Sequence, residues 1–313
     1  MPSPAEDYLA AALSLMERHA LHRERIDWSA LRRKCARLAA GLSAPAETYD
    51  TIRWALTQLE ERHSFFAPPE RGDAAIADGE YVAELSLPGG ELLADRLACL
   101  RVPGFRGSPQ HATRYADVLQ TLIAEMDAAS PGGWMVDLTE NWGGDMWPML
   151  AGLGPLLGEG PLGSFIFPDH PPAIWRYRAG QAWLDGDSLA KTAGDGYRLR
   201  VASPPVALLV SERTASSGEA VLIAFVGRPN ARSFGANTRG LTTANEGFSL
   251  ADGATIMLTV CTYADRLGRV YGHAIEPDQR VQGDVQEIQT HAAAWIDATK
   301  TAAPGRRLDW DRA

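Results

Sequence analysis

The chain is short of two residue types that often carry chemistry, cysteine and lysine. Its three cysteines, Cys35, Cys99 and Cys261, are far apart in 313 residues and form no Cys-x-x-Cys or Cys/His pattern. This spacing favours buried, reduced thiols over a disulfide scaffold or a zinc site. We therefore expect no metal and no cofactor. The lysines also number three, at positions 34, 191 and 300, and none lies beside a motif described below.

Long apolar runs and runs of basic residues are also missing. No stretch reaches the ~18 uninterrupted apolar residues that cross a bilayer, and Glu17, Arg18 and His19 interrupt the segment where a secretory signal would have its apolar core. The net charge of −9 is spread along the chain, unlike the basic patch of a nucleic-acid-binding protein. The sequence thus predicts no membrane span, no nucleic-acid partner and a cytoplasmic location, although a chain trimmed of a leader would look the same. It does not indicate the oligomeric state.

What the sequence does contain is enough apolar residues, 45%, for a sizeable core. Helical periodicity from Ala5 to about Arg62 predicts an N-terminal helical module over residues 1–66, with its last helix at Thr48–Glu61. Residues 67–313 alternate apolar, β-branched runs with helical patterns, which predicts an α/β domain. We expect strands at 81–87, 97–102, 134–138, 206–210 and 254–260, helices at 113–128, 146–157, 216–226 and about 284–300, and Pro/Gly-rich loops at 67–78, 158–173 and 184–196.

Ser216 occupies a turn between the strand at 206–210 and the following helix. A hydroxyl at such a turn is held outward on rigid elements, near backbone N–H groups and the positive end of a helix dipole that can stabilise an oxyanion. A second interpretation is structural, because Ser216-Ser-Gly-Glu219 also matches the capping box of a helix N-terminus. The serine turn alone does not decide between a nucleophile and a cap.

Two further features bear on that choice. Gly143 and Gly144 follow the strand at 134–138, where paired glycines let backbone N–H groups approach negative charge; they could equally form a plain turn. His63 stands where the helical module ends, a position that also suits a histidine as a helix cap.

These features, in this order, resemble peptidase family S41, the C-terminal-processing or tail-specific serine peptidases. The resemblance covers roughly residues 50–282 and implies a ClpP/crotonase-like ββα spiral core for residues 67–313, acting on a peptide or an unfolded protein. The motifs that carry it are Arg62-His63-Ser64, Asp137-Leu-Thr-Glu-Asn141-Trp-Gly143-Gly144, Thr214-Ala-Ser216-Ser-Gly-Glu219, the segment from Leu250 to Thr259, and Gly272-His-Ala-Ile-Glu-Pro-Asp278.

The chain departs from the family pattern at the base. Many members pair the serine with a lysine in a Gly-Lys-Gly-Thr segment, and Leu241 takes that place here. Arg239 stays protonated at any working pH and cannot serve, whereas a histidine titrates near neutrality. The resemblance to the Ser–His branch therefore implies Ser216 as nucleophile, His63 as general base, and N–H groups of Ser217 and of Gly143 or Gly144 as oxyanion donors. Glu246, just beyond the vacated lysine position, is the candidate that orients His63.

Three other functions compete with this prediction. A non-catalytic carrier of apolar ligands or peptides on the same scaffold would not need the serine, the histidine and the glycine pair together. An esterase of the α/β-hydrolase type requires a Gly-x-Ser-x-Gly pentapeptide, and none occurs. A purely structural role has no support beyond the helical module. The interval between Phe66 and Leu97 is too short for a separate peptide-binding domain, so specificity for protein C-termini cannot be assumed.

Overall fold

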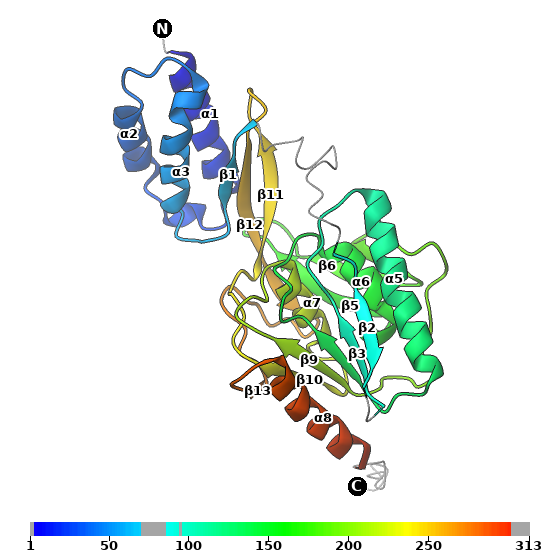
Figure 1. The fold of residues 1–313 in the computed structure, drawn as a ribbon. Helices are drawn as coiled ribbons and strands as arrows, with labels where there is room; N and C mark the ends of the chain where they lie inside the picture. The colour runs from blue at the N-terminus through cyan, green and yellow to red at the C-terminus, as the bar shows by residue number, and fades with distance from the viewer. Residues whose placement is uncertain (1–2, 70–85, 94–95, 302–313) are drawn as a thin grey trace, which may run out of the picture.

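The computed structural model describes residues 3–69, 86–93 and 96–301. At the N-terminus three α-helices pack together (Figure 1). Ser3 caps the first helix, with Glu6 completing a capping box, and Asp27 caps the second. The helices are α1 (Pro4–His19), α2 (Trp28–Leu38) and α3 (Tyr49–Thr57), with the short 3₁₀ helices η1 (Arg23–Arg25) and η2 (Pro45–Thr48) between them.

The third helix is shorter than the sequence suggested. It was expected to run to Glu61 but ends at Thr57. Glu60 has a φ of +57°, which an α-helix cannot accommodate. Residues 58–64 are thereby released as a loop, and this loop carries His63.

The first sheet is antiparallel throughout. Its order is β1-β12-β5-β6-β7-β8, with β11 also pairing with β12. The strands are β1 (Phe65–Ala67), β5 (Gly160–Ile166), β6 (Ala173–Arg178), β7 (Gln181–Leu184), β8 (Asp187–Lys191), β11 (Thr243–Ser249) and β12 (Thr255–Asp265).

Two predicted loops were wrong in this sheet. The segments 158–173 and 184–196 contain β5 and β8. In β5, Gly160, Pro161 and Gly163 weaken the local preference for a strand, but pairing with β12 and the burial of Leu162 override it. The predicted loop at 67–78 and the predicted strand at 81–87 lie mostly outside the described residues.

The second sheet is mainly parallel, in the order β13-β10-β9-β4-β3-β2, with only β2 antiparallel to its neighbour. The strands at 98–101, 134–137 and 206–210 and the helices that follow them agree with the predicted positions, whereas the strand at 231–235 was not predicted; the α/β prediction is confirmed. The strands are β2 (Gly89–Leu92), β3 (Ala98–Arg101), β4 (Trp134–Asp137), β9 (Val206–Val210), β10 (Ala231–Gly235) and β13 (Gln279–Arg280); the helices are α5 (Pro109–Ala128), α6 (Met146–Leu157), α7 (Ser217–Phe225) and α8 (Val285–Thr301).

Helices cover both faces of the second sheet. Residues of α5, α6 and α7 pack with one face and with the first sheet into the main core, while α8 packs against the opposite face through Ile288, Ala292 and Ile296. The parallel strands are therefore buried on both sides, which explains why their sequences are continuously apolar. Cys35, Cys99 and Cys261 are buried free thiols, as expected.

The hairpin of β11 and β12 joins the helical module to the rest of the molecule (Figure 1). Phe66, Leu250, Ala254, Ile256 and Leu258 belong to the same hydrophobic core as the three N-terminal helices. Near the tip, the hydroxyls of Tyr8 and Tyr49 both donate to Asp252, at 2.7 Å and 2.5 Å. The predicted boundary at residue 66 separates the helical module from the rest of the chain in sequence. In space, the hairpin of residues 243–265 packs into the core of that module.

Candidate active site

Ser216 stands at a strained turn between β9 and α7. Its φ of +51° and ψ of −116° lie in a region that residues with a side chain rarely adopt. A capping serine has an extended backbone instead. Glu219 does accept from the Ser216 N–H, as in a capping box, but among the described residues the Ser216 hydroxyl accepts no hydrogen bond from the backbone of α7. Burial raises the pKa of the Tyr263 phenol, and the nearby Ser216 side chain lowers it in part. The geometry therefore favours the nucleophile over the cap.

Glu219 fixes this turn from beneath. Its side chain is fully buried, and Oε2 accepts from the N–H groups of Ser216 and Leu241, both at 2.8 Å. Oε1 accepts from the Thr238 hydroxyl at 2.5 Å and the Gly240 N–H at 2.8 Å. Burial raises the pKa of Glu219, and these four hydrogen bonds oppose that shift. One carboxylate thus holds both the serine turn and the segment in which related peptidases carry lysine.

The predicted glycine pair lies against Ser216. A Cβ on Gly143 would stand 2.9 Å from the Ser216 Cβ and 3.1 Å from the Ser217 nitrogen, and the Gly143 φ of +106° also suits only glycine. The carbonyl of Gly144 accepts from the Ser217 hydroxyl at 2.5 Å. The Gly143 N–H already donates to Asn141 Oδ1 at 3.0 Å. Of the predicted oxyanion donors, the N–H groups of Gly144 and Ser217 are those with no acceptor in the described part of the chain.

His63 is held at three points. Its backbone N–H donates to Glu61 Oε2 at 2.6 Å, its carbonyl accepts from Asn245 Nδ2 at 2.7 Å, and its ring Nδ1 lies 2.8 Å from Thr243 Oγ1. Thr259 supports this arrangement, since its hydroxyl lies 2.8 Å from both Glu61 and Asn245. Burial lowers the pKa of His63, and the negative charge of Glu61 raises it in part. The ring is thus kept in its neutral, basic form.

The segment 241–243 connects His63 to the serine turn. The N–H groups of Leu241 and Ser216 donate to the same oxygen of Glu219, and the Thr242 carbonyl accepts from the N–H of Tyr263, whose phenol lies near the Ser216 side chain. Thr243, the next residue, contacts the His63 ring. The segment 241–243 thus contacts the surroundings of both predicted residues, Ser216 and His63, which lie 153 positions apart in the sequence, the difference between 216 and 63.

The structure does not bring Glu246 to His63 as the sequence suggested. Thr243 occupies the position at Nδ1. Side chains alternate along a strand, so Glu246, three residues later on β11, faces away from Thr243 and is exposed. The sequence did not predict the residues that contact or support His63, which are Glu61, Thr243, Asn245 and Thr259. Of these, only Glu61 lies close enough to His63 in the sequence to have been proposed from it.

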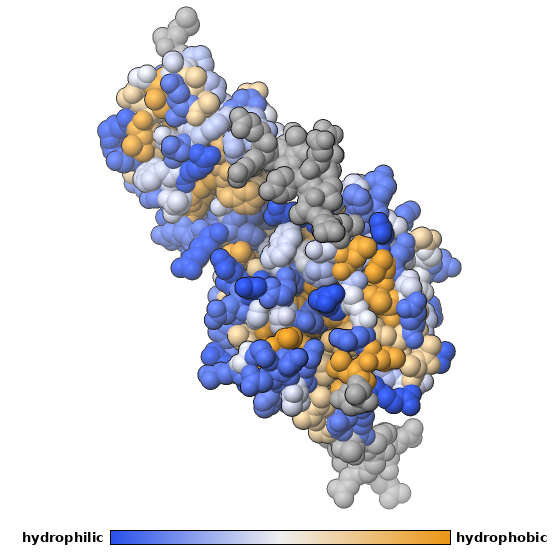
Figure 2. Space-filling model, in the orientation of Figure 1, coloured by the Kyte–Doolittle hydropathy of each residue, from blue (hydrophilic) through white to orange (hydrophobic). Residues whose placement is uncertain are grey.

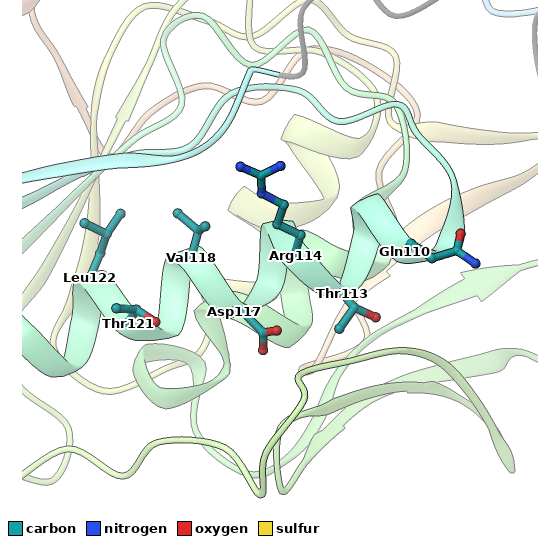
Figure 3. A pocket seen from close by; sticks show the side chains of 7 residues that line it. All are labelled: Gln110, Thr113, Arg114, Asp117, Val118, Thr121 and Leu122. Carbon is teal, nitrogen blue, oxygen red and sulfur yellow. The ribbon is translucent and has the colours of Figure 1, made fainter. Parts of the chain in front are cut away.

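Two cavities lie apart from this site. One, of about 530 Å³, is lined by residues of β5, β6 and β7 and of the turns beside them. The other, of about 410 Å³, runs along α5. Figure 3 shows that its lining side chains all come from α5 and point to different sides of the helix, so they do not converge on a ligand. Apolar residues gather on the same face of the molecule beside this region (Figure 2).

The described residues contain neither a membrane-spanning helix nor a metal-binding cluster. None of the helices there is long and apolar enough to cross a membrane. No cluster of three or more His, Cys, Asp or Glu side chains among these residues is arranged to bind a metal ion.

Comparison with known proteins finds related sequences. The model of peptidase family S41 matches residues 96–281, a range that includes Ser216 and the glycine pair but not His63. The Nisin-resistance protein of Lactococcus lactis subsp. lactis is 28% identical over 296 residues, which cover 94% of this chain and 87% of that protein.

Solved structures share the fold. A lipoprotein from Streptococcus agalactiae superposes with a TM-score of 0.76 at 24% identity, over 95% of this chain and 98% of the other. The photosystem II D1 C-terminal processing protease superposes with a TM-score of 0.62 at 15% identity, over 92% and 97% of the two chains.

Proposed function

Because the chain belongs to peptidase family S41 and is a peptidase, we propose that it hydrolyses peptide bonds through an acyl-enzyme formed on Ser216. His63 is the general base. The backbone conformation of Ser216 is the observation that carries the proposal, because its positive φ is not that of a helix cap and its Cβ lies close to Gly143. Strain of this kind concentrates at functional sites.

The reaction follows the acyl-enzyme scheme. The Ser216 oxygen attacks the peptide carbonyl carbon while its proton passes to His63 Nε2. The oxyanion of the tetrahedral intermediate accepts hydrogen bonds from the N–H groups of Ser217 and Gly144. The C–N bond then breaks, and His63 returns the proton to the leaving amine. Water, deprotonated by His63, then attacks the acyl carbonyl carbon; the ester C–O bond breaks, and His63 returns the proton to the Ser216 oxygen as the carboxylic acid product leaves.

Histidine rather than lysine is the base for three reasons. Leu241 stands at the lysine position of related peptidases, and its N–H is engaged by Glu219. The lysines lie elsewhere: Lys34 is on α2, Lys191 ends β8 and Lys300 is in the last turn of α8. Burial lowers the pKa of His63, which favours the neutral ring that a general base requires.

The substrate is a peptide or an unfolded protein. The similar protein from Lactococcus lactis is named for resistance to nisin, so nisin belongs in the first panel of peptides to be tested, beside casein as an unfolded protein. A cytoplasmic location is kept as an expectation from the sequence.

The test is labelling with a fluorophosphonate, which reacts with activated serines. We expect one adduct, on Ser216 by peptide mapping, and its loss in Ser216→Ala and His63→Ala. Ser29→Ala, an exposed serine of α2, is the control and keeps full labelling. Absence of an adduct on Ser216 in folded wild-type protein, or wild-type labelling of His63→Ala, would reject the Ser–His mechanism.

A further inference from the structure

The imidazole ring of His63 meets a hydroxyl at the position where serine peptidases of the triad type place an acid. The Nδ1 atom lies 2.8 Å from Thr243 Oγ1. The carboxylate of Glu61 is close, but it is bound to the backbone N–H groups of His63 and Ser64 and to the Thr259 hydroxyl. Thr243 is the group that contacts the ring.

We infer that Thr243 is a positioning residue that fixes the orientation and the tautomer of His63 through its hydroxyl. This inference rests on the proposed Ser216–His63 chemistry. For Nε2 to accept the serine proton, the neutral ring must carry its own proton on Nδ1. That proton is donated to Thr243 Oγ1, which leaves the lone pair of Nε2 for Ser216.

Burial and strand pairing hold Thr243 in place. It is buried, and its backbone pairs with Thr262 in the β11–β12 ladder. Because threonine is β-branched, its χ1 angle has few choices in a strand. Asn245, two residues later on the same face, binds the His63 carbonyl. Strand β11 thus contacts both the ring and the backbone of His63.

A hydroxyl at Nδ1 differs from a carboxylate in how far it stabilises the protonated His63 ring. When Nε2 takes the serine proton, both ring nitrogens become donors, and Thr243 can still accept from Nδ1. It brings no negative charge, so the imidazolium is stabilised less than it would be by an acid. Among the charged groups around the ring, Glu61 acts from the histidine's own loop, and Glu246 on β11 is exposed on the opposite face of that strand. The site therefore depends on ring orientation more than on a buried ion pair.

The experiment compares Thr243→Val, which removes the hydroxyl at nearly constant shape, with Thr243→Ser, which keeps it. The rate of fluorophosphonate labelling of Ser216 is measured from pH 5 to 9, and the ¹⁵N shifts of the His63 ring report its tautomer. We expect Thr243→Val to label about 10²-fold more slowly, the lower end of what a positioned base contributes, with the ring proton redistributed between the two nitrogens. Thr243→Ser should label at close to the wild-type rate and retain the proton on Nδ1.

Thr255→Val is the matched control. Thr255 lies on β12 of the same hairpin, and its hydroxyl has no hydrogen-bond partner among the described residues, so its loss should leave labelling unchanged. Wild-type labelling by Thr243→Val, with none by His63→Ala, would overturn the role of Thr243 and leave the Ser–His proposal standing. Equal losses in Thr243→Val and Thr243→Ser would assign Thr243 to packing alone. Wild-type labelling by His63→Ala would overturn both.

Discussion

The N–H of Ser216 and the N–H of Leu241 donate to the same oxygen of Glu219, each at 2.8 Å. Leu241 occupies the position where many related peptidases carry their catalytic lysine. In this chain the backbone there is fixed by Glu219, and Thr243, two residues later, reaches the His63 ring. Under the proposed mechanism, the segment that carries the catalytic lysine in those peptidases here positions the general base, His63, which comes from another part of the chain.

Glu219→Gln should disable the serine turn. An amide offers one oxygen and places an NH₂ group where the carboxylate accepts hydrogen bonds, so at least two of the four donors lose their acceptor. We expect a loss of about 2 kcal/mol or more in unfolding free energy, since buried unpaired polar groups cost that much. Labelling of Ser216 should fall about 10-fold or more, equivalent to ~1.4 kcal/mol. Urea unfolding and labelling rates measure the two effects.

Glu246→Gln provides the matched control for that substitution. Glu246 is exposed on β11, so the change should alter stability by no more than about 0.5 kcal/mol and leave labelling intact. Equal effects at the two positions would contradict the role assigned to Glu219. A selective loss of labelling in Glu246→Gln would restore Glu246 as the residue that orients His63.

Gly143→Ala should inactivate the enzyme by direct contact. The new methyl group would stand 2.9 Å from the Ser216 Cβ and 2.9 Å from the Ala215 carbonyl oxygen, which displaces the nucleophile. We expect labelling to fall about 10²-fold, comparable to the loss of an oxyanion donor.

Gly158→Ala separates this contact from backbone strain. Gly158 also has a positive φ, +81°, but nothing lies within 4 Å of the position that its new methyl group would take. Its substitution should lower the melting temperature through the backbone alone and leave labelling of the folded protein unchanged. If both alanine variants label like the wild type, Gly143 does not pack on the nucleophile in the way described.

Local patterns predicted the parts of the fold that local sequence determines. The strands Trp134–Asp137 and Val206–Val210 are buried on both faces, so their apolar runs stand out. By contrast, β5 begins Gly-Pro-Leu-Gly and exists because β12 and β6 pair with it. The local sequence of β5 does not favour a strand, so the segment was predicted as a loop.

The same distinction applies to the site. The turns that carry Ser216, Gly143 and Gly144 have a recognisable local composition and were found from it, whereas the roles predicted for these residues came from the resemblance of the ordered motifs to family S41. The contact of His63 with Thr243 joins residues 180 positions apart, and it depends on how the β11–β12 hairpin passes the loop after α3. Nearness to the vacated lysine position suggested Glu246, but strand alternation turns that side chain away, and only the paired structure reveals it.

The pH dependence of the reaction should reflect the lowered pKa of His63. Burial shifts this pKa below its usual value near 6.5. A lowered pKa keeps the ring neutral, and therefore basic, at more acidic pH, so activity is retained below pH 6.5 and lost as pH falls through the folded-state pKa. We expect the acid limb of the labelling rate of the free enzyme to have its midpoint below 6.5. A midpoint at or above 6.5 would mean that the charge of Glu61 outweighs burial.

Thr255→Val should stabilise the protein, because the Thr255 hydroxyl is buried and has no hydrogen-bond partner in the described part of the chain. Burying an unpaired hydroxyl costs about 1 kcal/mol or more, and valine fills the same space between β1 and β11 without that cost. The comparison is Thr48→Val: Thr48 is also buried, but its hydroxyl donates to the Pro45 carbonyl at 2.7 Å. Urea unfolding should therefore show opposite changes, a gain of about 1 kcal/mol for Thr255→Val and a loss of similar size for Thr48→Val. A loss at both positions would indicate that Thr255 does form a hydrogen bond, and its use as a silent control for Thr243→Val would then fail as well.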